Sequence, residues 1–293
     1  MVADRTEAAR TRPATAASFP PRATMPTAAP ADSRTPTAAG RTVLVTGASG
    51  GLGRALALAC AAAGATVIVH GRIVRRLEQL YDEIVAAGGP TPAILPLDLA
   101  TATADEFDRA AGALRGQVGR LDALVHVAAT LGSLGPTEHQ TLEAWDRVLR
   151  VNVAAALAIT RSLLPLLAEA PDAAVVFTLD SRAQDPRAFW GAYGASKAAL
   201  AAFAATLADE VEERPGIRVN AVIPGPIRSP LRTLTHPGED KLPLPPPEAL
   251  APLYLHLVAG QSKAASGRVF AAADWLAGRT GGTPLFTPRP AAP

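Results

Sequence analysis

Short apolar runs alternate along the chain with longer amphipathic or alanine-rich stretches. The apolar runs predict strands at 42–46, 65–70, 93–97, 121–127, 173–179, 217–223 and 268–271. The stretches between them predict helices beginning near Gly51 and over 74–85, 103–117, 141–168, 193–213 and 248–260. Strands that alternate with helices of this length imply an α/β fold: a single doubly wound parallel sheet of the Rossmann type, with helices on both faces. Ligands of such a sheet bind over the carboxyl ends of the strands.

The two ends of the chain lack this alternation. Residues 1–40 are rich in Ala, Thr, Pro and Arg, and they predict a disordered tail because they cannot bury enough apolar surface to offset the entropy of ordering. We expect removal of residues 1–38 to leave folding and cofactor affinity unchanged; a transit peptide, or a true start at Met25, stays open for this segment. One domain is predicted over 41–275 and a flexible C-terminal tail over 276–293. Residues 224–247 predict a loop, since eight of them are proline.

Composition limits the function classes. The formal net charge of +2 is carried by residues 1–40, with five arginines against three acidic residues, so the predicted domain is neutral and shows no nucleic-acid footprint. No apolar run reaches the length of a membrane span, and the five histidines lack paired metal-ligand spacing. Cys60, the only cysteine, predicts a buried structural thiol in an apolar helix. These features favour a soluble cytoplasmic protein with a small-molecule substrate, no metal, no nucleic acid and no membrane.

A glycine-rich turn joins the first predicted strand to its helix, with the sequence TGASGGLG over 46–53. Gly47 can adopt the tight-turn conformation, Gly51 allows a pyrophosphate to approach the backbone, and Gly53 allows close helix–strand packing. The helix start offers N–H groups and the positive end of a dipole to phosphates. Strand, glycine turn and helix in this order indicate dinucleotide binding, although the spacing GxxxGxG is one residue longer than the usual fingerprint.

The run YGASK places Tyr193 and Lys197 four residues apart, and therefore on one face of a helix. A nearby ammonium favours the phenolate, so we expect a lowered Tyr193 pKa and a role as general acid or base. The alternative is a solvent-exposed pair of helical side chains, which would have the same spacing. The glycine turn upstream, with Asn152 between the two motifs, makes the pattern specific.

Together these motifs resemble the short-chain dehydrogenase/reductase family from about Arg41 to Ala273. They comprise TGASGGLG, Asp98 after the third strand, Asn152 in VLRVNVAAAL, YGASK and PGPIRSP. Within the family, the phrases WGAYGASK, PLYLHL and SLLPLL are most similar to the bacterial YciK-type oxidoreductases. The resemblance implies that Tyr193 exchanges a proton with a carbonyl or alcohol, Lys197 binds the nicotinamide ribose, and Asn152 holds a water in a proton relay. It also implies a homodimer or homotetramer that pairs through 141–168 and 193–213.

The resemblance further implies a cofactor site. Asp98 would meet the adenine edge, and Ile227 and Ser229 would line the nicotinamide side. The cofactor-binding set is Gly47, Ser49, Gly51, Leu52, Gly53, Arg72, Asp98, Leu99, Ala128, Tyr193, Lys197, Pro224, Gly225, Ile227 and Ser229. A carboxylate after the second strand would bind the ribose of NAD, whereas this chain has Gly71 and Arg72 there. A guanidinium favours the 2′-phosphate of NADP over NAD, and a solvent-facing arginine is the alternative.

The chain departs from the family pattern in two places. His126-Val127-Ala128-Ala129 replaces the usual NNAG or HNAG; Val127 cannot make the hydrogen bonds of an asparagine, and His126 predicts a structural histidine. Asp180 occupies the position of the family's substrate-holding serine, thirteen residues before the tyrosine, and joins Tyr193, Lys197 and Asn152 as a candidate catalytic residue. We expect an ionised Asp180, stabilised by Arg182 and Lys197, with a protonated Asp180 that donates a hydrogen bond as the alternative. We expect Ser181 to point the other way.

Three functions follow from these patterns. The first is an NADP-dependent oxidoreductase acting on a carbonyl or alcohol, with residues 224–250 as a mobile lid over the substrate. The second is an NADP-binding protein with lost or reduced catalysis, serving as a sensor or assembly partner, and Asp180 and the HVAA segment favour it. A nucleotide-free structural module is disfavoured because all three phosphate-loop glycines are present. Cofactor binding without turnover of any carbonyl would separate the second function from the first.

Overall fold

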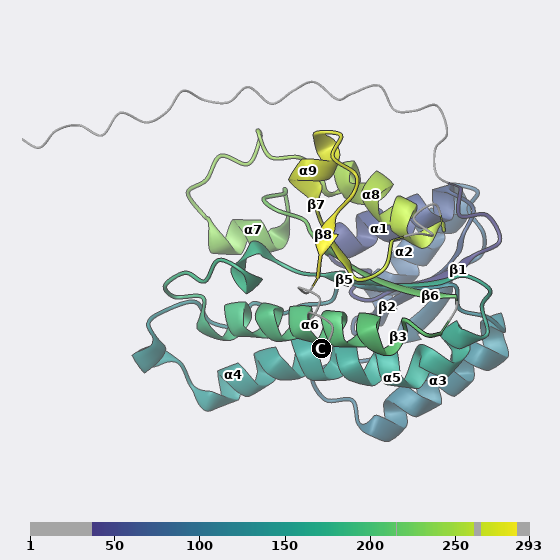
Figure 1. Ribbon diagram of the computed structural model, residues 1–293, viewed down its shortest axis with the longest axis horizontal. Coiled ribbons are helices and arrows are strands. Elements are labelled where there is room, and N and C mark those ends of the chain that lie inside the picture. Colours follow the sequence, from purple (N-terminus) through teal and green to yellow (C-terminus); the bar gives the residue numbers. More distant parts are fainter. Residues whose placement is uncertain (1–36, 215, 261–264, 286–293) are drawn as a thin grey trace, which may run out of the picture.

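A single eight-stranded sheet organises the computed structural model, which describes residues 37–214, 216–260 and 265–285. Its strands are β1 (Thr42–Val45), β2 (Thr66–Gly71), β3 (Ala93–Pro96), β4 (Ala123–His126), β5 (Ala173–Thr178), β6 (Ile217–Ile223), β7 (Arg268–Ala271) and β8 (Thr283–Pro284). Their order is β3-β2-β1-β4-β5-β6-β7-β8; β1 to β7 run parallel and β8 is antiparallel to β7 (Figure 1). The predicted doubly wound parallel sheet is confirmed.

Helices cover both faces of the sheet (Figure 1). On one face lie α1 (Gly51–Ala62), α2 (Val74–Ala86) and α8 (Ala251–Val258), and on the other α3 (Ala104–Val118), α5 (Ala155–Ala168) and α6 (Gly191–Glu210). Three short helices complete the described fold: α4 (Leu142–Leu149), α7 (Pro230–Thr235) and α9 (Ala272–Leu276). Side chains alternate across β1, so Val43 and Val45 pack in one core while Leu44 packs in the other. Burial on both faces is the reason that the strands are uninterrupted apolar runs.

Two predicted segments differ from the structure. The predicted helix 141–168 is interrupted by a π-helical turn, Arg150–Ala154, which contains Asn152. The predicted loop 224–247 contains α7, because Ser229 accepts a hydrogen bond from the Arg232 N–H as its N-cap and Pro230 fits the first helical position. Local capping chemistry therefore overrides the high proline content of this segment.

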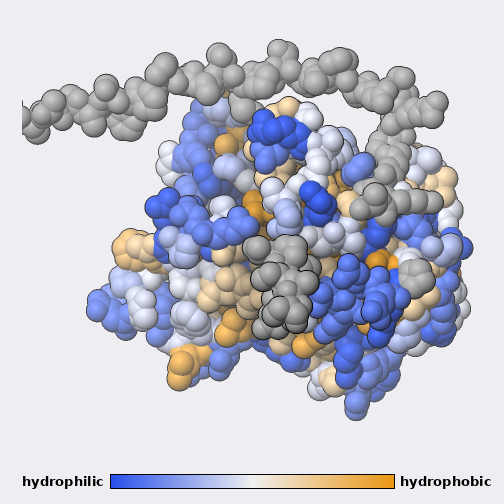
Figure 2. Space-filling view, viewed as in Figure 1, coloured by the Kyte–Doolittle hydropathy of each residue, from blue (hydrophilic) through white to orange (hydrophobic). Residues whose placement is uncertain are grey.

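The stretch Leu142–Ala168 is long and apolar enough to cross a membrane by length and composition, which corrects the expectation that no run reaches that length. The core helix of a soluble protein passes the same test. Here the stretch belongs to the layer of helices on one face of the sheet, and Ile159, Leu163 and Leu167 are buried in a core beneath it. On the face seen in Figure 2, hydrophilic side chains surround the apolar patches.

The described domain extends beyond both predicted boundaries. Ala38 is fully buried and its N–H donates to the Ala63 carbonyl oxygen at 2.8 Å, although 1–40 was predicted as a tail. At the other end, Thr283–Pro284 pairs with β7 inside the segment predicted as a flexible tail. Residues 1–36 and 286–293 of the two predicted tails lie outside the described residues.

Deleting residues 1–38 should therefore destabilise the protein relative to a matched deletion of 1–36, contrary to the sequence-based expectation. Loss of one hydrogen bond and one buried methyl group costs about 1 kcal/mol, which lowers the Tm of a domain of this size by about 2–4 °C. Thermal unfolding of the two truncated proteins measures the difference. Equal melting temperatures would show that Ala38 contributes nothing.

His126 is a structural histidine, as predicted. Its ring stacks on Phe177 with centroids 4.7 Å apart, and its Nε2 lies 2.9 Å from the Thr160 hydroxyl oxygen. Because that hydroxyl donates to the Ala156 carbonyl oxygen, His126 must donate through Nε2–H. Burial lowers the His126 pKa to about 3 and the pKa of His70, at the end of β2, to about 4.

These two histidines should make the fold sensitive to acid. In the unfolded chain each takes up a proton below pH 6.5, whereas in the folded protein it stays neutral down to about pH 4. The free energy of unfolding should therefore fall by about 1.4 kcal/mol per pH unit for each histidine as the pH drops from 6.5 to 4. His126→Phe, which keeps the stacked ring, should remove one histidine's share of this slope, and the exposed His139→Gln should not change it. Urea unfolding across this pH range measures the slope, and an unchanged slope in His126→Phe would contradict this origin.

Candidate functional site

A cavity of about 1270 Å³ opens at the carboxyl ends of the strands, beside β1 and β4, where the order of the strands in the sheet reverses. The glycine turn, the ends of β2, β4 and β5, and the segment around α7 all contribute to its walls. Its volume exceeds that of a pocket for one drug-sized ligand, so a dinucleotide and a small molecule can share it. With the exception of Asn152, every predicted site residue lines this cavity.

The glycine turn requires its glycines. Gly47 has φ +67°, and a Cβ there would lie 2.9 Å from the Ala128 Cα, while a Cβ on Gly53 would overlap the Gly47 carbonyl oxygen. A Cβ on Gly51 would lie 3.1 Å from the Cδ of Pro230. No side chain caps the start of α1, so the N–H groups of its first turn stay available for an anion.

Two residues that the sequence analysis missed hold this turn in place. His70 accepts a hydrogen bond from the Gly47 N–H through Nδ1 at 3.3 Å, and the Thr46 hydroxyl accepts from the N–H groups of Val127 at 3.0 Å and Ala128 at 3.1 Å. The loop after β4 is thus held by its backbone, which explains why a valine is tolerated at 127. The signal in the sequence that could have identified Thr46 and His70 is that each is a polar residue at the end of an apolar, buried strand.

One end of the cavity is cationic. Arg72, which precedes α2, and Arg76 in its first turn line this end, and neither guanidinium has a partner among the described residues. A Cβ at Gly71 would lie 3.2 Å from Leu77 Cδ2 and 3.3 Å from Ser49 Oγ, so a side chain at the position where a carboxylate would select NAD requires these two side chains to shift. Leu99 and Asp98 complete this end; Asp98 accepts a hydrogen bond from the Ala100 N–H at 3.0 Å. The arrangement suits a ribose that carries a phosphate.

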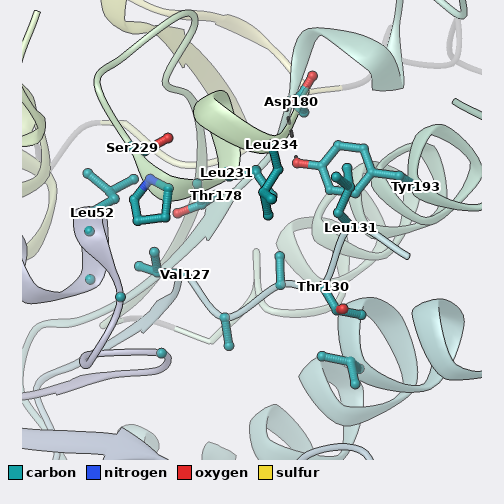
Figure 3. A pocket seen from close by; sticks show the side chains of 18 of the residues that line it. Leu52, Val127, Thr130, Leu131, Thr178, Asp180, Tyr193, Ser229, Leu231 and Leu234 are labelled. Carbon is teal, nitrogen blue, oxygen red and sulfur yellow. Dashed lines mark hydrogen bonds between the residues drawn. The ribbon is translucent and has the colours of Figure 1, made fainter. Parts of the chain in front are cut away.

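Tyr193, Asp180 and Lys197 meet where β5 ends beside α6 (Figure 3 shows Tyr193 and Asp180 facing each other). The Tyr193 hydroxyl donates to Asp180 Oδ2 at 3.2 Å. Lys197 Nζ donates to the Thr178 carbonyl oxygen at 2.8 Å and lies 5.7 Å from the centroid of the Tyr193 ring. Tyr193 and Lys197 are almost fully buried, so their charges are poorly screened.

The expected lowering of the Tyr193 pKa is wrong for this structure. Burial and the adjacent Asp180 carboxylate both raise the Tyr193 pKa, because each disfavours the phenolate. Burial lowers the Lys197 pKa to about 8, and the Asp180 carboxylate acts in the opposite direction. The Asp180 carboxylate has a larger effect on the Tyr193 pKa than the Lys197 ammonium, because the carboxylate accepts the phenol's hydrogen bond, whereas Lys197 donates to Thr178.

The Asp180 carboxylate accepts three hydrogen bonds. Oδ1 accepts from the Arg182 N–H at 2.9 Å and from the Ser181 hydroxyl at 3.4 Å, in addition to the bond from Tyr193 to Oδ2. Arg182 supports the carboxylate through its backbone, while its guanidinium pairs with Asp185 at 3.3 Å and lies over the Trp190 ring. Arg182 therefore stabilises Asp180 through its backbone N–H and not through its guanidinium. A carboxylate that accepts three hydrogen bonds has the arrangement of the ionised form.

Asn152 does not reach the cavity wall. It is buried in the π-helical turn, where Oδ1 accepts from the Thr130 N–H at 2.7 Å and Nδ2 donates to the Thr130 carbonyl oxygen and to Ser196 Oγ, each at 2.9 Å. The asparagine thus links the loop after β4 to the residue next to Lys197. Turns of this kind occur frequently at functional sites.

Apolar side chains surround the outer part of Tyr193. Leu231 and Leu234 of α7 and Leu131 of the loop after β4 approach one another there (Figure 3), and Pro224, Gly225, Ile227 and Ser229 continue this wall toward the glycine turn. The segment after α7 is fastened by the ion pair of Arg232 with Glu239 at 2.6 Å. Among the described residues, no group of three or more His, Cys, Asp or Glu is placed to hold a metal ion.

The chain is similar in sequence and in structure to known short chain dehydrogenases. Residues 41–240 match the family model for short chain dehydrogenase. The oxidoreductase YciK of Escherichia coli K12 is 39% identical over 230 residues, which cover 78% of this chain and 90% of YciK. Crystal structures of a short chain dehydrogenase from Shigella flexneri with NADP and of one from Escherichia coli CFT073 with NADPH are each 38% identical; both superpose with a TM-score of 0.79 over 82% of this chain and 99% of theirs.

Proposed function

Because the chain belongs to the short-chain dehydrogenase family, we propose that this oxidoreductase transfers hydride between NADP and a small carbonyl or alcohol, with Tyr193 as general acid or base. The observation that carries the proposal is Tyr193, whose hydroxyl donates to Asp180 and whose ring centroid lies 5.7 Å from Lys197 Nζ, in the same cavity as the glycine turn. NADPH oxidation with a panel of aldehydes and ketones tests it. The proposal fails if NADPH binds and neither carbonyls nor any other reducible substrate is turned over.

The residues present fit an NADP molecule. The uncapped start of α1 and the close packing at Gly47 and Gly53 suit its pyrophosphate, and Arg72 with Arg76 suits its 2′-phosphate. Ile227 and Ser229 would line its nicotinamide side, and Lys197 would bind its ribose. When bound, the nicotinamide supplies or accepts the hydride. The relatives from Shigella flexneri and Escherichia coli crystallised with NADP and NADPH support NADP over NAD.

The protein's own residues would control the proton. A raised Tyr193 pKa keeps the phenol protonated at neutral pH, and a protonated phenol can donate to the oxygen of a reduced carbonyl. To do so, Tyr193 must exchange its hydrogen bond with Asp180 for one with the substrate. Lys197 would then stabilise the phenolate that remains. As the family resemblance implies, Asn152 would hold a water in the proton relay; its amide is buried against Thr130 and Ser196.

Replacing Arg72 with Ala should weaken binding of NADPH more than that of NADH. A hydrogen bond to a charged group contributes about 1.5–3 kcal/mol, so the preference for NADPH should fall at least about tenfold. Calorimetric titration of both cofactors measures this ratio. Arg75→Ala is the matched control, because Arg75 lies three residues after Arg72, on α2, but outside the cavity. Equal losses for the two cofactors in Arg72→Ala would refute the assignment of NADP.

Asp180 favours a second function, an NADP-binding protein with reduced catalysis that acts as a sensor or assembly partner. A carboxylate beside Tyr193 repels the negative charge that develops on a carbonyl oxygen during reduction. Tight NADPH binding without any turnover is the result that would favour this function.

We also propose a homodimer or homotetramer that works in the cytoplasm. The family resemblance and the exposed, half-accessible Leu157 on α5 support assembly through the long helices. Sedimentation of the wild type and of Leu157→Glu would test this interface, since a charge at the centre of a paired face would dissociate it.

A further inference from the structure

Asp180 presents only hydrogen-bond acceptors to the reacting centre. Its two oxygens accept from Tyr193, Arg182 and Ser181, and the ionised carboxylate has no proton to donate. A substrate atom that enters beside the Tyr193 hydroxyl therefore meets a negative charge 3.2 Å from the phenol oxygen. The substrate itself must supply the donor at this point.

The negative charge of Asp180 has opposite effects on the reduction of a carbonyl and of a protonated C=N bond. A carbonyl oxygen gains negative charge when hydride adds to its carbon, so the transition state is repelled by Asp180. A protonated C=N bond begins positive and carries an N–H donor, so the same carboxylate attracts it. A neighbouring carboxylate also raises the pKa of a bound imine, which keeps the imine in its protonated, reducible form.

We propose that Asp180 makes this enzyme a reductase of protonated C=N bonds, in which the substrate N–H donates to Asp180 Oδ2. The inference rests on the proposed NADPH-dependent hydride transfer and names the substrate class for that site: a small cyclic imine. Leu131, Leu231 and Leu234 offer apolar walls for the carbon ring. The positive charge of Lys197 would repel the iminium, but its Nζ donates to the Thr178 carbonyl oxygen, whereas Asp180 would contact the iminium directly.

The step balances without a proton from the enzyme. The iminium carbon receives a hydride from NADPH, a C–H bond forms, and the π electron pair of the C=N bond moves onto nitrogen as a lone pair. The products are a neutral secondary amine and NADP⁺. Tyr193 supplies no proton here, so Tyr193→Phe should retain reduction of an iminium while losing reduction of a ketone.

Binding tests the proposal without catalysis. Benzamidinium is a planar C=N cation that NADPH does not reduce, and benzamide is its neutral isostere. Calorimetric titration of the NADP⁺-loaded protein should show at least about tenfold tighter binding of benzamidinium, as expected for a charge-assisted hydrogen bond. Asp180→Asn, which preserves shape and removes charge, should abolish this preference. Asp146→Asn is the matched control, because Asp146 is exposed on α4 outside the cavity. Equal binding of the two probes by the wild type, or a preference that survives in Asp180→Asn, overturns the proposal.

Turnover separates failure of this proposal from failure of the proposed function. The wild type should reduce 2-methyl-1-pyrroline at least about tenfold faster than cyclopentanone, and Asp180→Asn should reverse that order. Faster reduction of cyclopentanone by the wild type would refute the substrate class while leaving the NADPH-dependent oxidoreductase intact. If Asp180→Asn does not fold, the wild-type comparison of the two substrates and the two binding probes still decides the outcome.

Discussion

Replacing Tyr193 with Phe should abolish carbonyl reduction, with a loss of about a hundred- to ten-thousandfold in kcat. The Tyr193 hydroxyl faces the cavity at the reacting centre, and its raised pKa keeps it protonated and ready to donate. Phe preserves the buried ring and its packing but removes the proton. Among the residues that the structure describes, no other acid touches this point, because Asp180 accepts the hydrogen bond and Lys197 is bound to Thr178.

Steady-state kinetics with NADPH and a reactive ketone measures the loss. The affinity for NADPH should stay unchanged, since the mutation removes only the proton donor. Tyr81→Phe is the matched control, because Tyr81 lies on α2 away from the cavity. A Tyr193→Phe protein that reduces the ketone at the wild-type rate would mean that another group supplies the proton.

Replacing Asp180 with Ser should raise carbonyl reduction by about a hundred- to a thousandfold. A serine hydroxyl can donate to the oxygen that becomes negative, whereas the carboxylate repels it. Removing the carboxylate also lowers the Tyr193 pKa toward its ordinary value, because its charge and its hydrogen bond both raise that pKa. The same substitution should slow reduction of a cyclic imine, since the partner of the cation is lost.

The Asp180→Ser variant distinguishes the two protonation states of Asp180. An ionised Asp180 gives slow wild-type reduction of ketones and a gain of ketone reduction in Asp180→Ser. If Asp180 were protonated and donating, Asp180→Ser would change little except the pH profile. A large loss of ketone reduction in Asp180→Ser at every pH would contradict both states and make Asp180 a dedicated substrate-binding group.

Much of the fold follows from local pattern. Uninterrupted apolar runs must be buried on both faces, so β1 to β7 and the parallel sheet could be predicted from the sequence. The glycine turn is equally local, because the positive φ of Gly47 and the close approach at Gly53 demand glycine itself. The site residues were found at the ends of strands and on one face of a helix, and the cavity brings all but Asn152 together.

What only the tertiary structure decided concerns contacts between distant segments. The hydrogen bonds that Thr46 and His70 accept depend on which strand ends become neighbours. The place of Arg76 at the cavity depends on how α2 packs against the sheet. The Tyr193 pKa shifts in the direction opposite to the one expected from its own helix. The spacing of YGASK places Lys197 near the ring, but the fold directs that ammonium to Thr178 and brings Asp180 to the hydroxyl. Electrostatic energy falls with distance and rises with burial, and neither quantity is contained in the spacing of residues along a chain.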